Sequence, residues 1–158
     1  MHATTTMNPE IKASWTGRLR SGEIKQGREY LGRGDARCCL GVLCDLAGIA
    51  GVITPHQDVH YDENGKPDFD DWWDYGQEGT SGTGDETLPA LVQEWADLNG
   101  DRASNPLVSV PDELVSRLPE AARILLGIGD GPNTITLAQL NDAGVPFGLI
   151  ADIIDATL

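Results

Sequence analysis

The spacing of apolar residues near the N-terminus predicts an amphipathic helix. Ile11, Trp15 and Leu19 recur every four residues, as they do along one face of a helix. Asn8 is a favourable N-cap residue. Pro9 suits the first helical position, because a residue there has no intrahelical N–H bond to lose. We therefore expect a helix that begins at Pro9.

The next apolar segments predict two more helices. We expect a short helix over residues 23–31, with Ile24 and Leu31 facing inward. Residues 38–53 read CCLGVLCDLAGIAGVI, an almost wholly apolar run that is too short to cross a bilayer. We interpret this run as the buried central helix, in which Gly41 allows a neighbouring segment to approach closely.

The middle of the chain predicts a β-hairpin. Asn64-Gly65 is a strong signal for a tight hairpin turn. It lies between Val59-His60-Tyr61 and the run from Phe69 to Tyr75. We therefore expect two paired strands, with Trp72 and Trp73 on the second arm.

The C-terminal half predicts short alternating elements that end in a pair of helices. In order, these are a helix over 88–98 capped by Thr87, a strand over 106–110, helical turns from 111, a strand over 124–126, a helix over 137–142 and a last helix from 146. Thr136 is the expected cap of the helix over 137–142. Together, the patterns predict an α+β fold that is mainly helical, with a small antiparallel β-hairpin or sheet and a C-terminal αα-hairpin.

Length and composition fit one folded domain. The chain has 158 residues, 40% of them hydrophobic, which is ordinary for a soluble domain. The first residues lack the apolar core of a signal peptide. We expect a disordered lead-in over 1–7, a single globular domain over 8–158, and a cytoplasmic location.

The charge of the chain is strongly acidic but unevenly distributed. The formal net charge is -14, which argues against a general nucleic-acid binder because an acidic surface repels a polyanion. Residues 12–37 nevertheless hold seven Lys and Arg against three Asp and Glu, a net of +4, whereas residues 38–158 have a net of -17. Three interpretations of this basic segment remain open: it packs on the acidic body, its cations converge on an anion, or it binds nucleic acid by itself.

Part of the basic segment has the composition of a small-anion site. Lys25 and Arg28 would share one face of a helix, and Gln26 adds a polar group beside them. Aromatic side chains from the hairpin arm could stack against a base. The candidate ligand-binding residues are Lys25, Gln26, Arg28, Arg33, Arg37, Trp72, Trp73 and Tyr75.

The three cysteines are better explained as buried apolar residues than as a site. Cys38, Cys39 and Cys44 are odd in number and clustered, which does not fit a disulfide framework. Their spacing is also a poor match to the paired spacing of zinc ligands. No His lies nearby in sequence to activate a thiol, so we predict no catalytic residue.

A metal site is a further alternative. His56, Asp58 and His60 alternate along an extended stretch and so share one face. The run from His60 to Asp71 also resembles an imperfect calcium loop. A solvated acidic hairpin explains the same residues without an ion, and we predict no cofactor and no metal.

Two other patterns carry weak signals. The run Gly127-x-Gly129-x-Gly131 is not followed at once by a helix, as a phosphate-binding loop would be. The C-terminal hairpin has nearly helix-turn-helix spacing, but no Lys or Arg follows Arg123 to contact DNA. We interpret that hairpin as a packing element.

Several motifs, taken together, resemble a widespread group of small tailed-phage proteins. They are, in chain order, Asn8-Pro9-Glu10-Ile11-Lys12, Lys25-Gln26-Gly27-Arg28, Cys38-Cys39-Leu40-Gly41-Val42-Leu43-Cys44-Asp45-Leu46-Ala47, Tyr75-Gly76, Leu88-Pro89, Glu94-Trp95-Ala96, Leu140-Asn141-Asp142, Phe147 and Ile150-Ala151-Asp152. The resemblance covers most of residues 8–155. It implies a phage or prophage origin and a location inside the infected bacterium, and it transfers no catalytic residue.

These observations lead to three functional hypotheses. The first is a phage accessory, anti-defence protein that binds and sequesters a small anionic ligand, such as a nucleotide immune signal, without catalysis. The second is an acidic interaction protein that mimics DNA or inhibits a basic host protein. The third is a metal-dependent hydrolase. The expected partners are a small anion or a host protein, with self-association left open, and neither nucleic acid nor membrane.

Overall fold

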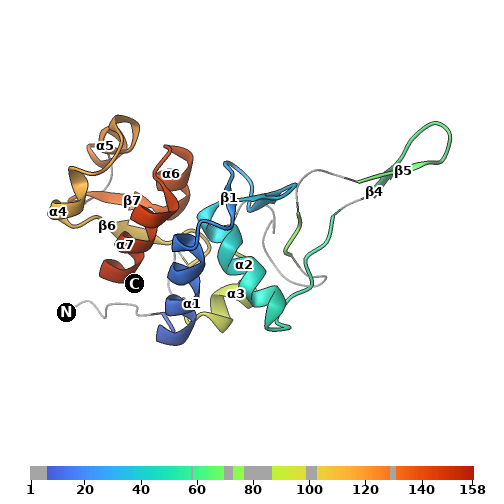
Figure 1. The fold of residues 1–158 in the computed structure, drawn as a ribbon, viewed down its shortest axis with the longest axis horizontal. Coiled ribbons are helices and arrows are strands. Elements are labelled where there is room, and N and C mark those ends of the chain that lie inside the picture. The colour runs from blue at the N-terminus through green and yellow to red at the C-terminus, as the bar shows by residue number, and fades with distance from the viewer. Residues whose placement is uncertain (1–6, 58, 70–72, 77–86, 99–102, 129–130) are drawn as a thin grey trace.

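The computed structural model describes residues 7–57, 59–69, 73–76, 87–98, 103–128 and 131–158, which form an α+β fold (Figure 1). The helices are α1 (Pro9–Arg20), α2 (Cys39–Ile49), α3 (Ala90–Trp95), α4 (Asp112–Val115), α5 (Glu120–Leu126), α6 (Leu137–Asp142) and α7 (Phe147–Thr157). The strands are β1 (Lys25–Gln26), β2 (Gly32–Arg33), β3 (Ala36–Arg37), β4 (Val59–Tyr61), β5 (Pro67–Phe69), β6 (Leu107–Ser109) and β7 (Thr134–Thr136). They pair in the orders β1-β3-β2, β4-β5 and β6-β7. The predicted fold class is confirmed.

Helix α1 begins and packs as its sequence predicts. The side chain of Asn8 accepts hydrogen bonds from two backbone N–H groups of the first turn, which satisfies donors that a helix start leaves unpaired. Trp15 is fully buried and donates from its indole nitrogen to the carbonyl of Cys39 at 2.8 Å. The helix lies along α7 (Figure 1).

Met7 packs with the folded domain, although the predicted domain boundary lies at residue 8. Met7, which we placed in the lead-in, is buried and donates its backbone N–H to the carbonyl of Leu158 at 3.2 Å. Residues 1–6 lie outside the described part of the chain.

Helix α2 is the buried central helix that the apolar run predicts. It lies between α1 and the sheet β1-β3-β2 (Figure 1), and most of its side chains are buried. A Cβ on Gly41 would overlap the carbonyl of Leu31. Glycine is therefore required where the loop before β2 crosses this helix.

The predicted helix over residues 23–31 is wrong. Lys25 and Gln26 form β1, which pairs in parallel with β3, and the chain then turns through Glu29, whose φ is 73°. A right-handed helix cannot contain a residue at that φ. Leu31 is still buried, as predicted, but it reaches the core from the bend that precedes β2.

The hairpin β4-β5 is confirmed, although its second strand spans Pro67–Phe69 and so lies closer to the turn than the predicted arm from Phe69 to Tyr75. Tyr61 pairs with Pro67 across the turn at Asn64-Gly65, and Gly65 has the positive φ that such a turn requires. The hairpin extends away from the rest of the molecule (Figure 1). Trp73 lies beyond β5, and Trp72 falls outside the described residues.

Two other elements differ from prediction. Residues 120–126 form helix α5, so the expected strand over 124–126 is wrong. Pro119 precedes the first turn of α5, and the buried residues of the helix, Ala122 and Leu126, are four positions apart, as on one helical face. Helix α3 spans only Ala90–Trp95, because Leu88 donates its backbone N–H to the carbonyl of Ser104 and is not helical. Consequently Pro89, and not Thr87, precedes its first turn.

The C-terminal αα-hairpin is confirmed. Thr136 and Gln139 form a reciprocal capping box at the start of α6, and Gly144 follows the helix with a φ of 90°. Helix α7 buries Phe147, Ile150 and other apolar residues against the core. The residues before Thr136 form β7, which the sequence did not predict, and this strand pairs with the predicted strand β6.

The length and apolar character of the helices bear on whether any of them could cross a membrane. Within the part of the chain that the structure describes, no helix combines the length and apolar character that a bilayer crossing requires.

Candidate functional site

The turn after β1 has a strained backbone at Glu29. Glu29 has a φ of 73°, in the left-handed region that a side chain disfavours. Tyr30 donates its backbone N–H to the carbonyl of Arg28 at 2.9 Å. A hydrogen bond across three residues with positive φ at the centre is the rarer and more strained form of γ-turn. Such strain persists only where the surrounding structure imposes it.

Asn141 of α6 holds the chain on both sides of this turn. Its side-chain oxygen accepts from Gln26 Nε2 at 3.0 Å and from the backbone N–H of Cys39 at 3.1 Å. Its side-chain nitrogen donates to the carbonyl of Gly27 at 2.7 Å. Because Asn141 is fully buried, each of these bonds is made in a low-dielectric environment where an unpaired group would be costly.

Two further bonds complete the support of the turn. Asp142 accepts the backbone N–H of Glu29 at 3.0 Å. Gln26 also donates to the carbonyl of Val145 at 2.8 Å. Helix α6 and the loop after it therefore fix the segment Lys25–Glu29, although more than 110 residues separate the two in sequence.

The predicted ligand-binding residues of the sheet β1-β3-β2 lie on two opposite faces. Lys25 on β1 and Arg33 on β2 are both paired with Ala36 on the central strand β3. Residues paired in register project to the same side of a sheet. Lys25 and Arg33 thus share one face, on either side of the small Ala36 side chain, and both are exposed.

The other face of the same sheet is turned toward the body. Gln26 and Gly32 are both paired with Arg37 there. Arg37 donates from Nε to Asp45 of α2 at 2.7 Å, and from NH1 to the carbonyls of Gly34 and Ala36. Arg37 and Gln26 are therefore engaged in internal contacts that fasten the sheet to α2 and α6.

Tyr75 belongs to this internal network. Its side chain is fully buried and its hydroxyl donates to Asp45 at 2.8 Å. Burial, and then the charge of Asp45, raise the pKa of Tyr75 well above its usual range. Tyr75 therefore supports the Arg37–Asp45 pair and presents no face to a ligand.

Trp73 lies at the edge of the sheet. Its indole nitrogen donates to the carbonyl of Gly34 in the turn between β2 and β3 at 3.0 Å. The Arg37 guanidinium lies 5.7 Å from the centre of a Trp73 ring, within the range of a cation–π contact. Trp73 is half-buried, so part of the ring remains exposed at the sheet edge, next to Arg37, whereas Trp72 lies outside the described residues.

Arg28 projects from the strained turn. The side chain is exposed, and one guanidinium nitrogen lies 3.2 Å from the position that a Cβ would take on Gly144. It makes no ion pair with the residues that the structure describes. Lys25, at 72% exposure, lies 4.0 Å from Asp35, which is 88% exposed, and water screens such a pair strongly.

The cysteines do not provide a nucleophile. Cys38, Cys39 and Cys44 are buried, and burial raises the pKa of the Cys38 thiol to about 11 and the pKa of the other two well above their usual range. A thiol that stays protonated is a poor nucleophile and a poor metal ligand.

Nothing in the described part of the chain gathers metal ligands. No group of three His, Cys, Asp or Glu lies close enough there to hold an ion. His56 pairs with Asp74, with 3.7 Å between Nε2 and the carboxylate, while Asp58 and the His60 side chain lie outside the described residues. Gly129 of the glycine run also lies outside them.

Sequence reasoning found the cations but missed the residues that position them. Asn141 is four residues from Leu137 and next to Leu140, so it lies on the inward face of an apolar helix. A polar residue at such a position must be hydrogen-bonded, and this was the available signal. Its partners Gln26, Gly27 and Cys39 are too distant in sequence to be identified from any spacing.

Comparison with known proteins gives one relationship. Neither the curated proteins nor the solved structures include a match to this chain. A family model described as "Domain of unknown function (DUF8296)" matches residues 7–158, nearly the whole chain, and the chain therefore belongs to this family.

Proposed function

We propose that this protein binds a small anion with two negatively charged groups on the exposed face of the sheet β1-β3-β2, without catalysis. The observation that carries the proposal is the row Lys25–Ala36–Arg33, in which two exposed cations flank a small residue. Two strand spacings separate the outer residues by about 10 Å. A pyrophosphate or a nucleotide diphosphate has the length to contact both.

The backbone around this row supports a fixed arrangement of the cations. Two-residue strands have little stability of their own, yet these are fastened through Arg37 to Asp45 and through Gln26 to Asn141. A preorganised site spends less free energy on ordering when the ligand binds. Arg28, two residues after β1, is a further exposed cation, and its guanidinium lies beside Gly144 of the loop after α6.

The charge distribution favours a small ligand over a polymer. The net charge of -14 repels an extended polyanion such as DNA. A mononucleotide or dinucleotide contacts only the local basic face. Charge-assisted hydrogen bonds from Arg and Lys are the usual means of holding phosphate, and the half-buried Trp73 beside the β2–β3 turn is the candidate for stacking on a base.

The resemblance of the sequence motifs to tailed-phage proteins suggests the biological source of the ligand. We infer a phage accessory role in which the protein sequesters a host-derived nucleotide that signals infection. The buried, protonated cysteines support binding without turnover, because no activated thiol is available to attack the ligand.

Calorimetric titration tests the proposal. The panel is pyrophosphate, ADP-ribose and cyclic dinucleotides, and we expect saturable binding of at least one. Lys25→Ala and Arg33→Ala should each weaken it by at least about tenfold, because a charge-assisted hydrogen bond contributes about 1.5–3 kcal/mol, or roughly 10- to 150-fold in affinity. Arg123→Ala, which removes an exposed cation from α5, is the matched control and should bind as the wild type does. After incubation the ligand should be recovered chemically intact.

Two results would contradict the proposal. One is the absence of binding across the panel. The other is an equal loss of affinity in Arg123→Ala and Arg33→Ala, which would indicate a general effect of net charge and no defined site.

A further inference from the structure

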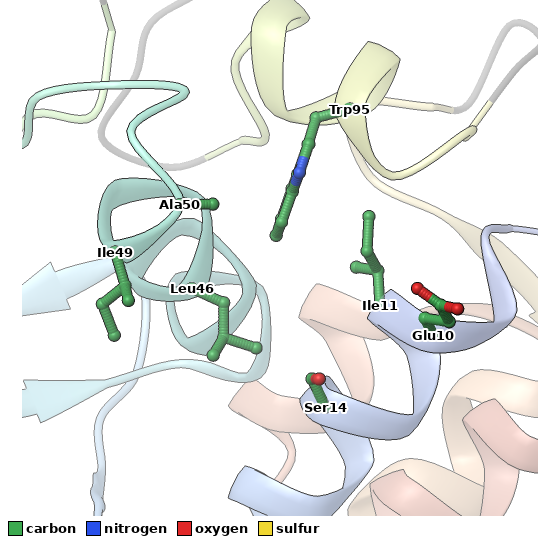
Figure 2. A pocket seen from close by; sticks show the side chains of 7 residues that line it. All are labelled: Glu10, Ile11, Ser14, Leu46, Ile49, Ala50 and Trp95. Atoms are coloured by element: carbon green, nitrogen blue, oxygen red, sulfur yellow. The ribbon is translucent and has the colours of Figure 1, made fainter.

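A separate pocket opens between α1, α2 and α3. Its volume is about 280 Å³, and Figure 2 shows its lining side chains coming from all three helices. They are Glu10, Ile11 and Ser14 of α1, Leu46 and Ile49 of α2, Ala50 after α2, and Trp95 of α3. Most of the lining is apolar, and the volume is close to the lower limit of ordinary small-ligand pockets.

Trp95 forms one wall of this pocket. Its indole projects from α3 into the space between α2 and α1, toward Ala50 and Leu46 on one side and Ile11 on the other (Figure 2). The side chain lines the pocket and is only half-buried. An aromatic face is thus open to a bound group.

The rim of the pocket combines one carboxylate with an exposed apolar residue. Glu10 is the only charged residue of the lining, and it makes no ion pair with a described residue. It lies in the first turn of α1. Ile49 at the rim is 76% exposed, so an apolar surface lies beside the carboxylate.

We propose that this pocket is the docking site for a basic segment of a partner protein, which inserts an arginine side chain. The aliphatic part of an arginine can lie against Leu46 and Ile11. The planar guanidinium can then stack on the Trp95 ring and pair with Glu10. The pocket accommodates one long side chain and no larger element, so it acts as a single anchor within a wider contact.

Charge complementarity favours a basic partner for this pocket. Glu10 lines the pocket and the exposed Glu94 directly precedes Trp95 on α3, so the local carboxylates as well as the net charge of -14 favour a basic partner. An acidic surface attracts a basic segment over long range and orients it before contact. The proposal concerns a different surface from the Lys25–Ala36–Arg33 row and does not depend on it.

The test uses a defined peptide and the full chain. The probe is Ac-Ala-Leu-Arg-Leu-Ala-amide, titrated into ¹⁵N-labelled protein and followed by two-dimensional NMR. We expect saturable shifts of the Trp95 indole N–H and of backbone amides in residues 10–14 and 46–50. Replacing the arginine of the peptide by citrulline, which has nearly the same shape but no charge, should abolish them.

The variants change exposed residues only, so a loss of binding cannot be attributed to a failure to fold. Ile49→Lys should abolish binding, whereas Ile124→Lys, the same change at a 60% exposed site on α5, should leave it unchanged. Glu10→Gln should weaken binding roughly two- to fivefold, as expected for loss of an exposed ion pair. Equal binding of the citrulline peptide, or unchanged binding to Ile49→Lys, would overturn the proposal.

Discussion

Gln26 donates a hydrogen bond of 3.0 Å from its side chain to the side-chain oxygen of Asn141, which lies 115 residues later in the chain. The same oxygen accepts the backbone N–H of Cys39 at the start of α2. One buried amide thus joins the first strand, the central helix and the C-terminal hairpin. The basic segment is held to the acidic body through this contact as well as through opposite charge.

Removing the Asn141 side chain should therefore be costly. We expect Asn141→Ala to lower the free energy of unfolding by about 3 kcal/mol, because it leaves several buried polar groups without partners. Urea denaturation measures this value. Asn105→Ala is the matched control: Asn105 is half-buried and makes one side-chain bond of 3.3 Å, to the N–H of Ala138, and should lose at most about 1 kcal/mol. Similar losses in both variants would show that Asn141 has no special role.

Two glycines in helices should respond in opposite directions to alanine. In Gly41→Ala the new Cβ would overlap the Leu31 carbonyl, so we expect a loss of at least about 2 kcal/mol. Gly17 of α1 faces open space, so Gly17→Ala should stabilise the protein by about 0.5–1 kcal/mol through better helix propensity. Thermal unfolding of the two variants compares them directly. A stable Gly41→Ala protein would contradict the close approach of Leu31 to α2.

The strained turn predicts that glycine is preferred at residue 29. The φ of 73° at Glu29 disfavours any side chain by about 1 kcal/mol. Glu29→Gly should therefore be more stable than Glu29→Ala by roughly that amount in chemical denaturation, despite the greater entropy of glycine in the unfolded chain. If alanine proves the more stable of the two, the turn does not hold residue 29 in the left-handed region.

The raised pKa of the buried Cys38 thiol predicts a loss of stability in alkaline solution. Burial raises the pKa of Cys38 from 9.0 to about 11, so the folded state retains a proton that the unfolded state releases. The corresponding stabilisation is complete below pH 9 and declines as the pH rises toward 11. Unfolding free energies measured between pH 7 and pH 11 should fall more steeply for the wild type than for Cys38→Ala. Parallel curves would contradict the burial of this thiol.

The same burial predicts slow modification of the native protein. A thiol reagent at pH 8 should react with fewer than one cysteine on a time scale over which urea-unfolded protein reacts at all three. Rapid reaction of the folded chain would mean that the region around α2 opens readily.

The sequence was most informative where a local signal dominates. The cap at Asn8, the cap at Thr136 and the turn at Asn64-Gly65 each depend on a few neighbouring residues, and the structure confirms each element. The apolar run of α2 was predicted to be buried because no exposed helix has that composition.

Errors occurred where distant contacts outweigh local preference. Residues 23–31 have an acceptable helical pattern, yet Asn141 and Asp142 hold them in an extended and then strained course. Residues 124–126 have the composition of a strand, but three or four neighbouring apolar residues fit either a strand or a short helix. Packing against the rest of the chain decides between them.

The sequence by itself determined the α+β class, the main helices, and the division of charge between a basic segment and an acidic body. Only the tertiary structure decided which bases contact solvent. Strand register puts Lys25 and Arg33 on one face and Gln26 and Arg37 on the other, and a shift of one residue would exchange them. That register depends on hydrogen bonds between segments far apart in the chain, whose partners no local pattern encodes.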